Sequence, residues 1–245
     1  MRRALPNALL LLCAILVSVE AQAEEPRLPV SVSARPLAIG RFNLLLGAEP
    51  GLTVGSTPSV YQVVLPLRFG ITDDLELFAG PVAQSVDPNV HEPALGVLYR
   101  FVRGPVEIGA RAAGDLSLFG AVRSATLQLG VPIRIHAGNI LAIDVGAHAL
   151  VSVLPQAGTF GLLVPAGVSI NVIDALTIGA AGAWKLPSFA STSTFTVPLA
   201  ATVGYTIAGG DRPFIDLAAQ AGWNDVRTSF SAFTVGASAK LYLYF

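Results

Sequence analysis

The chain has 245 residues with 15 Lys+Arg, 16 Asp+Glu and a formal net charge of −1, and 53% of its residues are hydrophobic while 13% are charged. This charged fraction is about half of that in typical soluble domains, so the composition disfavours a water-soluble globular protein. The sequence carries no basic patch, and we therefore expect no nucleic-acid partner.

The N-terminus has the layout of a secretory signal peptide. A basic start at Arg2 and Arg3 precedes the apolar residues 8–19, and Ala21-Gln22-Ala23 is a small-residue cleavage site. A membrane anchor is the alternative, but the apolar stretch is short for a spanning helix. Residues 1–23 are therefore predicted to be a cleaved signal peptide. Residues 24–36 are polar and contain proline, which suits an N-terminal periplasmic tail or a small plug.

Two long stretches, residues 145–173 and 186–210, contain no Asp, Glu, Lys or Arg, and hydropathy alone would allow either to be a spanning helix. Both contain proline, however, and both are rich in Gly, Ser and Thr. Around Ser169 the small and polar residues occupy every second position, which is the period of a strand. The sequence therefore favours strands over helices.

Tight turns rich in Gly, Asp, Asn and Pro recur about every 35 residues. They are predicted at residues 71–74, 102–105, 136–139, 172–175 and 209–212. Looser connections, such as residues 49–58, alternate with these turns. The period extends back to residue 37 and forward to residue 245, so residues 37–245 are expected to form about twelve strands. Short turns at one rim and longer loops at the other are typical of an outer-membrane barrel.

Alternation is clearest in the last strand. Leu241, Leu243 and Phe245 share an apolar face, while Lys240 and Tyr242 lie on the other face. One face suits lipid and the other a polar interior. This segment resembles the C-terminal signature of bacterial outer-membrane β-barrels, whose last strand carries the signal for barrel assembly. The resemblance implies outer-membrane lipid and the barrel-assembly machinery as partners. Together with the turns, it predicts an all-β fold, a transmembrane antiparallel up-and-down β-barrel.

The same alternation assigns faces to the other strands. Leu65, Leu67 and Phe69 point away from Arg68. The apolar face is expected to meet lipid, because a narrow interior cannot host so many branched side chains beside arginine. Inverting every face would give a soluble barrel with an apolar interior. The scarcity of charge, and the Gly and Ala on the polar faces, argue against that alternative.

Charges of both signs fall on the inward faces. The predicted lumen-lining residues are Arg68, Glu76, Arg100, Glu107, Arg111, Arg134, His136, Asp144, His148, Asp216 and Lys240. The expected facing pairs are Glu76 with Arg100, Glu107 with Arg134, and Asp216 with Lys240. Opposite charges at facing positions stabilise neighbouring strands. The charges either set ion preference or form a structural network, and their near balance favours the network. Recurring inward glycines either permit sharp coiling or leave room for a solute or plug.

Chemistry-bearing patterns are scarce. None of the three histidines, His91, His136 and His148, has a serine two positions away, which is the pairing that the outer-membrane phospholipase and deacylase families use. Metal spacings, phosphate loops and dinucleotide fingerprints are also missing from the sequence. We therefore expect no enzyme and no cofactor.

The sequence predicts an exported barrel in the outer membrane of a Gram-negative bacterium, acting as a narrow passive channel for small solutes or ions. A non-conducting structural or adhesion barrel with a salt-bridged lumen is the alternative, and a barrel hydrolase is a minor one.

Overall fold

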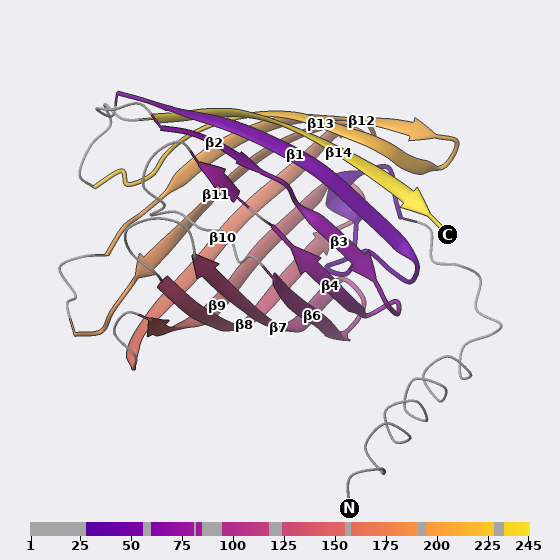
Figure 1. The fold of residues 1–245 in the computed structure, drawn as a ribbon. Coiled ribbons are helices and arrows are strands. Elements are labelled where there is room, and N and C mark those ends of the chain that lie inside the picture. The colour runs from indigo at the N-terminus through magenta and orange to yellow at the C-terminus, as the bar shows by residue number, and fades with distance from the viewer. Residues whose placement is uncertain are drawn as a thin grey trace, which may run out of the picture.

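A computed structural model of the chain describes residues 28–55, 60–80, 82–84, 95–117, 124–154, 158–190, 195–227 and 233–245. The predicted signal peptide and residues 24–27 lie outside the described residues. The described chain forms a single antiparallel sheet that closes on itself, as Figure 1 shows. The predicted fold class, an all-β antiparallel barrel, is confirmed.

A short 3₁₀ helix, η1 (Val32–Ala34), precedes the strands. The strand segments are β1 (Asn43–Val54), β2 (Val60–Val64), β3 (Leu67–Gly70), β4 (Leu75–Ala79), β5 (Val82–Gln84), β6 (Leu95–Val102), β7 (Val106–Ser117), β8 (Ser124–Ala137), β9 (Leu141–Leu154), β10 (Thr159–Ile173), β11 (Leu176–Leu186), β12 (Leu199–Gly209), β13 (Arg212–Trp223) and β14 (Phe233–Tyr244). None of the described residues forms a helix long and apolar enough to cross a bilayer.

Fourteen segments make twelve strands, because two strands are each broken in two. Both β2 and β3 pair with β1, so they are halves of one strand. Between them lies Pro66, which has no backbone N–H to donate to the ladder. In the same way β5 pairs with β2 and β4 pairs with β3. The expected strand number is therefore confirmed.

The barrel closes where β14 pairs with β1, from Asn43 opposite Tyr244 to Val54 opposite Phe233. Pairing of β14 with β1 removes the sheet edges that these two strands would otherwise expose, and a lipid environment favours this because it offers no water to unpaired backbone groups. The five predicted tight turns connect β3 to β4, β6 to β7, β8 to β9, β10 to β11 and β12 to β13. At three of them a glycine has a positive φ, namely Gly104, Gly138 and Gly210.

One predicted connection is wrong in its bounds. Residues 49–58 were expected to form a loop, but β1 continues to Val54. Glu49 therefore lies on a strand, where it faces Val64 of β2. Pro50 likewise lies within β1, opposite Val63. Residues 56–59 lie outside the described residues.

The outer face carries exposed apolar side chains on the long strands of the barrel, with Leu46, Leu67, Val131 and Ile178 among them. Exposed aromatic side chains gather at both ends of the strands. Near the turns they are Tyr99, Phe101, Tyr205, Phe214 and Phe245, and near the loops they are Phe160, Trp184, Phe189, Trp223 and Phe233. Two such belts are the arrangement that places amphipathic rings at the two membrane–water interfaces.

Inward glycines fall into two groups. A Cβ added at Gly130 would lie 1.9 Å from Nδ1 of His148, and one at Gly96 would lie 2.3 Å from Cζ of Phe78. These glycines accommodate a large side chain that lies across them. A Cβ added at Gly204, in contrast, would make ordinary contacts at 3.5 Å or more. At glycines of the second group, an added Cβ would collide with no neighbouring atom, so the missing side chain leaves free space.

We expect Gly130→Ala to destabilise the barrel by about 1–3 kcal/mol, because the buried His148 ring cannot move away without disturbing its neighbours. Urea unfolding of the detergent-folded protein, followed by tryptophan fluorescence, measures this change. Gly204→Ala is the matched control and should change the free energy of unfolding by much less. Equal effects of the two substitutions would contradict the distinction between the two groups of glycine.

Candidate functional site

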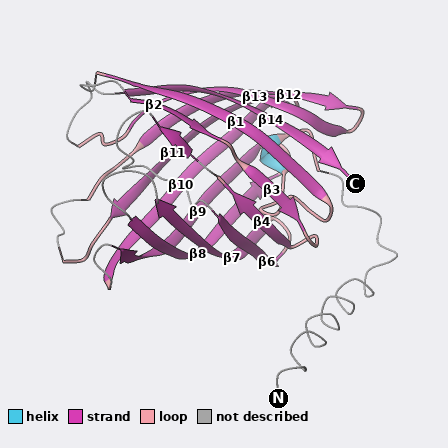
Figure 2. Cartoon of the chain, viewed as in Figure 1, coloured by secondary structure: helices cyan, strands magenta, loops and turns pink. Residues whose placement is uncertain are grey.

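The interior of the barrel contains the N-terminal segment Leu28 to Phe42, which we call the strap. Figures 1 and 2 show it, with η1, inside the barrel at the end that carries the tight turns. Leu28 and Ile39 of the strap pack with Leu45 of β1 and Tyr242 of β14 in one buried cluster. Residues 37–42, expected to belong to the barrel, are thus part of the strap, and the first strand begins at Asn43.

Carboxylates of the barrel wall bind the backbone of the strap. Oε2 of Glu107 accepts a hydrogen bond from the Leu37 N–H at 2.7 Å, and Oε2 of Glu76 accepts one from the Ile39 N–H at 3.0 Å. Arg68 donates from Nη2 to the Leu37 carbonyl at 2.9 Å. Glu76 is only 1% exposed. Because buried backbone groups need hydrogen-bond partners, these charged side chains of the wall supply the hydrogen bonds that a neighbouring strand would otherwise supply.

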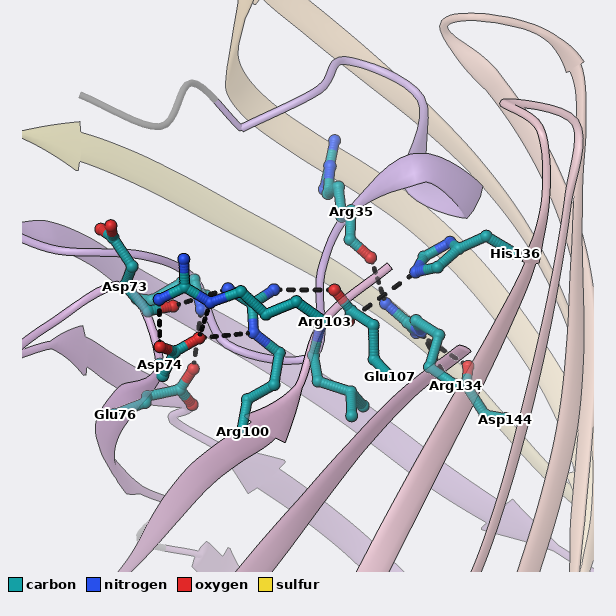
Figure 3. A network of polar contacts seen from close by, with 12 residues as sticks. Arg35, Asp73, Asp74, Glu76, Arg100, Arg103, Glu107, Arg134, His136 and Asp144 are labelled. Atoms are coloured by element: carbon teal, nitrogen blue, oxygen red, sulfur yellow. Dashed lines mark hydrogen bonds and ion pairs between the residues drawn. The ribbon is translucent and has the colours of Figure 1, made fainter. Parts of the chain in front are cut away.

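The polar contacts of the strap continue on the neighbouring strand β8 and on β10. Arg134 donates from Nη1 to the Arg35 carbonyl at 2.8 Å (Figure 3). Nδ1 of His136 lies 2.7 Å from the Ser33 carbonyl. Since a carbonyl only accepts, Nδ1 of His136 carries the proton. Oδ1 of Asn171 accepts from both the N–H and the hydroxyl of Ser33, at 2.9 and 2.7 Å. The strap is therefore bound to β7, β8 and β10 as well as to β3 and β4.

Arg35 is the charged anchor of the strap. Its Nη2 donates to Oδ1 of Asp216 at 3.0 Å and to Oγ1 of Thr206 at 3.1 Å, and its Nη1 donates to the hydroxyl of Tyr242 at 2.8 Å. Tyr242 in turn donates to Oδ2 of Asp216 at 2.7 Å. Three strands, β12, β13 and β14, thus converge on one guanidinium. Asp216 binds the guanidinium through both of its carboxylate oxygens, and such a bidentate contact fixes both the position and the orientation of the Arg35 side chain.

Two of the three expected facing pairs occur in the register, but their charges bind other partners. Asp216 faces Lys240, and Glu107 faces Arg134. Nζ of Lys240 instead binds Oε1 of Glu49 at 2.8 Å, because Asp216 is occupied by the strap. Arg134 pairs with Asp144 on the neighbouring strand β9, because the Glu107 carboxylate binds the strap.

The third expected pair, Glu76 with Arg100, is wrong. Glu76 faces Leu98 across β4 and β6, and its carboxylate binds Nε of Arg68 at 2.6 Å. Arg100 instead binds Oε1 of Glu107 through Nη1 at 2.7 Å. These long side chains reach partners other than the residue opposite them in the register, which simple counting from the turn does not reveal.

Asp144 and Asp74 complete the network drawn in Figure 3. Asp144 faces Arg134 across β8 and β9 and accepts from its Nε at 2.6 Å. Asp74, in the turn after β3, accepts from Nε of Arg100 at 2.9 Å and also binds Arg103. Burial by itself would raise the pKa of the Asp74 carboxyl, but the hydrogen bonds and charges of the two arginines outweigh it and hold the pKa below its usual 3.8.

Two of the three histidines lie within the described residues. His136 contacts the strap, and His148 is buried with its ring over Gly130. His91 lies outside the described residues.

Arg111 stacks on the Phe78 ring, with 4.4 Å from Cζ to the ring centre. Among the residues that the structure describes, no group of three or more His, Cys, Asp or Glu side chains is placed to hold a metal ion.

Two cavities lie inside the barrel, on the side of the strap that faces the loop end. The first has a volume of about 340 Å³, and Leu37 of the strap lines it together with Arg68, Glu76 and Arg111. The second has a volume of about 330 Å³, and Val32 of the strap lines it. Asp144 and Asp216 are also in its wall. Both cavities share Glu49, Arg134 and Lys240, so they are adjacent chambers of one interior.

The other predicted lumen residues lie outside these two cavities. Arg100, Glu107 and His148 are buried, and His136 contacts the strap. Their long-range contacts serve the strap and the wall rather than an open chamber.

Sequence reasoning missed several charged members of the network, among them Arg35, Glu49 and Asp74. Arg35 was in the segment expected to be a tail or small plug, Glu49 was in an expected loop, and Asp74 was in a turn. Alternation on the strand was the signal that could have found Glu49, because it lies two residues from Gly47 and Gly51 on the inward face. The sequence carries no comparable signal for Arg35, whose partner Asp216 is 181 residues away.

The C-terminal residues lie on the closing strand. Leu241 and Leu243 face Leu46 and Leu44 of β1, and the terminal Phe245 is 69% exposed on the outer side. Their role as a signal for barrel assembly stays a prediction, since it concerns a step before the folded state.

No family model and no curated protein matches the sequence. Solved structures do share the fold. A NanC porin is 12% identical, covering 81% of this chain and 100% of that one, with a TM-score of 0.65. A KdgM porin is 9% identical, covering 80% of this chain and 98% of that one, with a TM-score of 0.58. An outer membrane channel from Pseudomonas putida is 13% identical, covering 91% and 100%, with a TM-score of 0.52. The chain therefore has the porin-like fold of outer-membrane β-barrels.

Glu107→Ala should destabilise the folded barrel by about 3–5 kcal/mol, because it leaves buried Arg100 without that carboxylate and the Leu37 N–H without an acceptor. The free energy of unfolding in urea measures the change. Arg103→Ala, which removes a largely exposed partner of Asp74, is the control and should cost less than about 1 kcal/mol. A loss no larger than that of the control would contradict a structural role for Glu107.

The free energy of unfolding of the barrel at low pH should depend on the charge of the Asp74 carboxylate. Because its folded pKa lies below the unfolded value, its charge contributes stability that is complete above about pH 5 and is lost as the pH falls through the folded pKa, below 3.8. The stability difference between wild type and Asp74→Asn should therefore be constant from pH 7 to about pH 5 and shrink at lower pH. Urea unfolding at several pH values measures it. A difference that grows on acidification would contradict this assignment.

Proposed function

We propose that the chain is an outer-membrane channel through which small polar solutes pass. The observation that carries this proposal is the pair of adjacent cavities inside a closed barrel, about 340 and 330 Å³ in volume, which share the polar side chains of Glu49, Arg134 and Lys240. An interior filled with packed apolar side chains would indicate a solid barrel instead. The apolar outer face and the two aromatic belts support placement in a membrane.

The neighbours in structure support the same proposal. The KdgM porin is also known in complex with disordered oligogalacturonate, so one barrel of this fold binds a hydrophilic molecule. We infer that the present chain passes smaller solutes, because its strap narrows the mouth at the turn end. The interior charges are largely paired with one another, which predicts weak ion selectivity.

The strap also favours the alternative function. A segment bound to wall residues on both sides of the barrel closes much of the turn-side mouth, as expected of a non-conducting structural barrel. The two functions differ in one respect that can be measured. A channel conducts in its resting state or when the strap leaves, whereas a structural barrel conducts in neither case.

Reconstitution of the purified protein in a planar bilayer should show discrete conductance steps of small size. Arg35→Ala should make the steps larger or more frequent, because it removes the anchor that binds the strap to Asp216, Thr206 and Tyr242. Arg103→Ala is the control and should conduct like the wild type. An absence of conductance steps in both the wild type and the Arg35→Ala variant would contradict the channel function and favour the structural barrel.

A further inference from the structure

The ion pairs inside the barrel present their two members unequally to the interior. In the pair on β3 and β4, the side chain of Arg68 is 34% exposed while that of Glu76 is 1% exposed. In the pair on β8 and β9 the signs are reversed, because the side chain of Asp144 is 40% exposed while that of Arg134 is 18% exposed. A solute in the interior therefore meets mainly a cation at the first pair and mainly an anion at the second.

The exposed members of these two pairs line different cavities. The cavities of about 340 and 330 Å³ share the charged side chains of Glu49, Arg134 and Lys240. The other charged side chains are Arg68, Glu76 and Arg111 in the first cavity, and Asp144 and Asp216 in the second. Beyond the shared groups, positive charge therefore prevails in the first cavity and negative charge in the second.

Both exposed groups retain hydrogen-bonding capacity. Nε and Nη2 of Arg68 donate to Glu76 and to the strap, whereas Nη1, which is not fully buried, makes no hydrogen bond to a described residue. Asp144 accepts two hydrogen bonds from described residues, both donated by Arg134, and a carboxylate offers about four acceptor positions. Asp216, in contrast, already accepts four hydrogen bonds. Asp144 is therefore the carboxylate of the second cavity that can bind a solute.

The two exposed charges lie apart from each other. Figure 3 shows Glu76, the partner of Arg68, and Asp144 at opposite ends of the charged network. Both pairs hold the strap, since Arg68 and Arg134 each donate to one of its carbonyl groups, and the cavities lie on the loop-facing side of the strap. Small-molecule sites typically have volumes of about 300–1,000 Å³, so each cavity can enclose one end of a solute. A solute that reaches both charges must carry its own charges several bonds apart.

We propose that the two cavities together bind a small zwitterionic solute with a carboxylate at one end and an ammonium group at the other. Its carboxylate binds Arg68 in the first cavity, and its ammonium group binds Asp144 in the second. Opposite charges attract more strongly in an enclosed interior than in bulk water, because the effective dielectric constant is lower. The proposal names a solute class for the proposed channel and rests on that function, because a passing solute would occupy these cavities.

Saturation-transfer NMR of the detergent-folded protein measures binding without requiring conduction. Three solutes of equal chain length serve as probes. Of these, ε-aminocaproate is a zwitterion, adipate has a carboxylate at each end, and hexamethylenediamine has an ammonium group at each end. Adipate and hexamethylenediamine each meet a like charge at one end of the site, so each should bind about fivefold to tenfold more weakly than ε-aminocaproate, which should give a saturable signal.

Asp144→Asn should change the preference among these solutes. Removing the anion should weaken the binding of ε-aminocaproate about fivefold to tenfold, and it should strengthen the binding of adipate, whose second carboxylate no longer meets a like charge. Arg68→Gln should weaken ε-aminocaproate and strengthen hexamethylenediamine. A purely structural effect of either substitution would weaken all three solutes together. Because Arg68→Gln leaves buried Glu76 without its arginine, the measurements on Asp144→Asn decide alone if that variant does not fold.

Asp174→Asn is the matched control, because Asp174 lies in the turn between β10 and β11 and lines neither cavity. It should bind all three solutes like the wild type. The proposal is overturned if ε-aminocaproate gives no saturable signal, if adipate or hexamethylenediamine binds equally well, or if Asp144→Asn and Asp174→Asn bind alike. Bilayer conductance without saturable binding would overturn this site and leave the channel function standing. Saturable binding with the expected preference but without conductance would support the site and count against the channel function.

Discussion

Buried carboxylates on the inner wall hold a piece of the same chain by its backbone, and the arrangement of the whole interior depends on this contact. Glu76 and Glu107 each accept an N–H of the strap while each also binds an arginine of the wall. A carboxylate has room for both partners because its two oxygens together offer about four acceptor positions. The strap, the ion pairs and the wall are therefore one connected structure, and none of its parts can be changed alone.

This coupling divides the barrel along its axis. At the turn end, the strap and the charges are densely bonded and only small spaces remain. Toward the loop end, the strap forms the floor of two adjoining cavities through Leu37 and Val32. The strap thus restricts the interior at the turn side, and Arg35 binds it to the wall there.

The barrel is also divided around its circumference. On β4 and on β6 to β9 the inward side chains include the charged groups Glu76, Glu107 and Arg134, and a bulky neighbour lies over glycines such as Gly130. On β10 to β14 the inward side chains that line the second cavity include small hydroxyl and amide groups, and glycines such as Gly204 leave free volume. The two walls therefore differ in chemistry, with most of the ion pairs on one side and most of the hydroxyl and amide groups on the other.

The sequence by itself determined the period, the turns and the number of strands. A two-residue alternation and turn residues at a regular spacing are local properties, and a membrane barrel makes them strict because every strand has one lipid-facing side. Only the tertiary structure decided the ion pairs and the place of the strap. Arg35 reaches Asp216 across 181 positions of sequence, and Glu76 binds Arg68 rather than Arg100. Long charged side chains choose partners in three dimensions, and the strap competes for the same carboxylates, so no spacing in the sequence encodes these contacts.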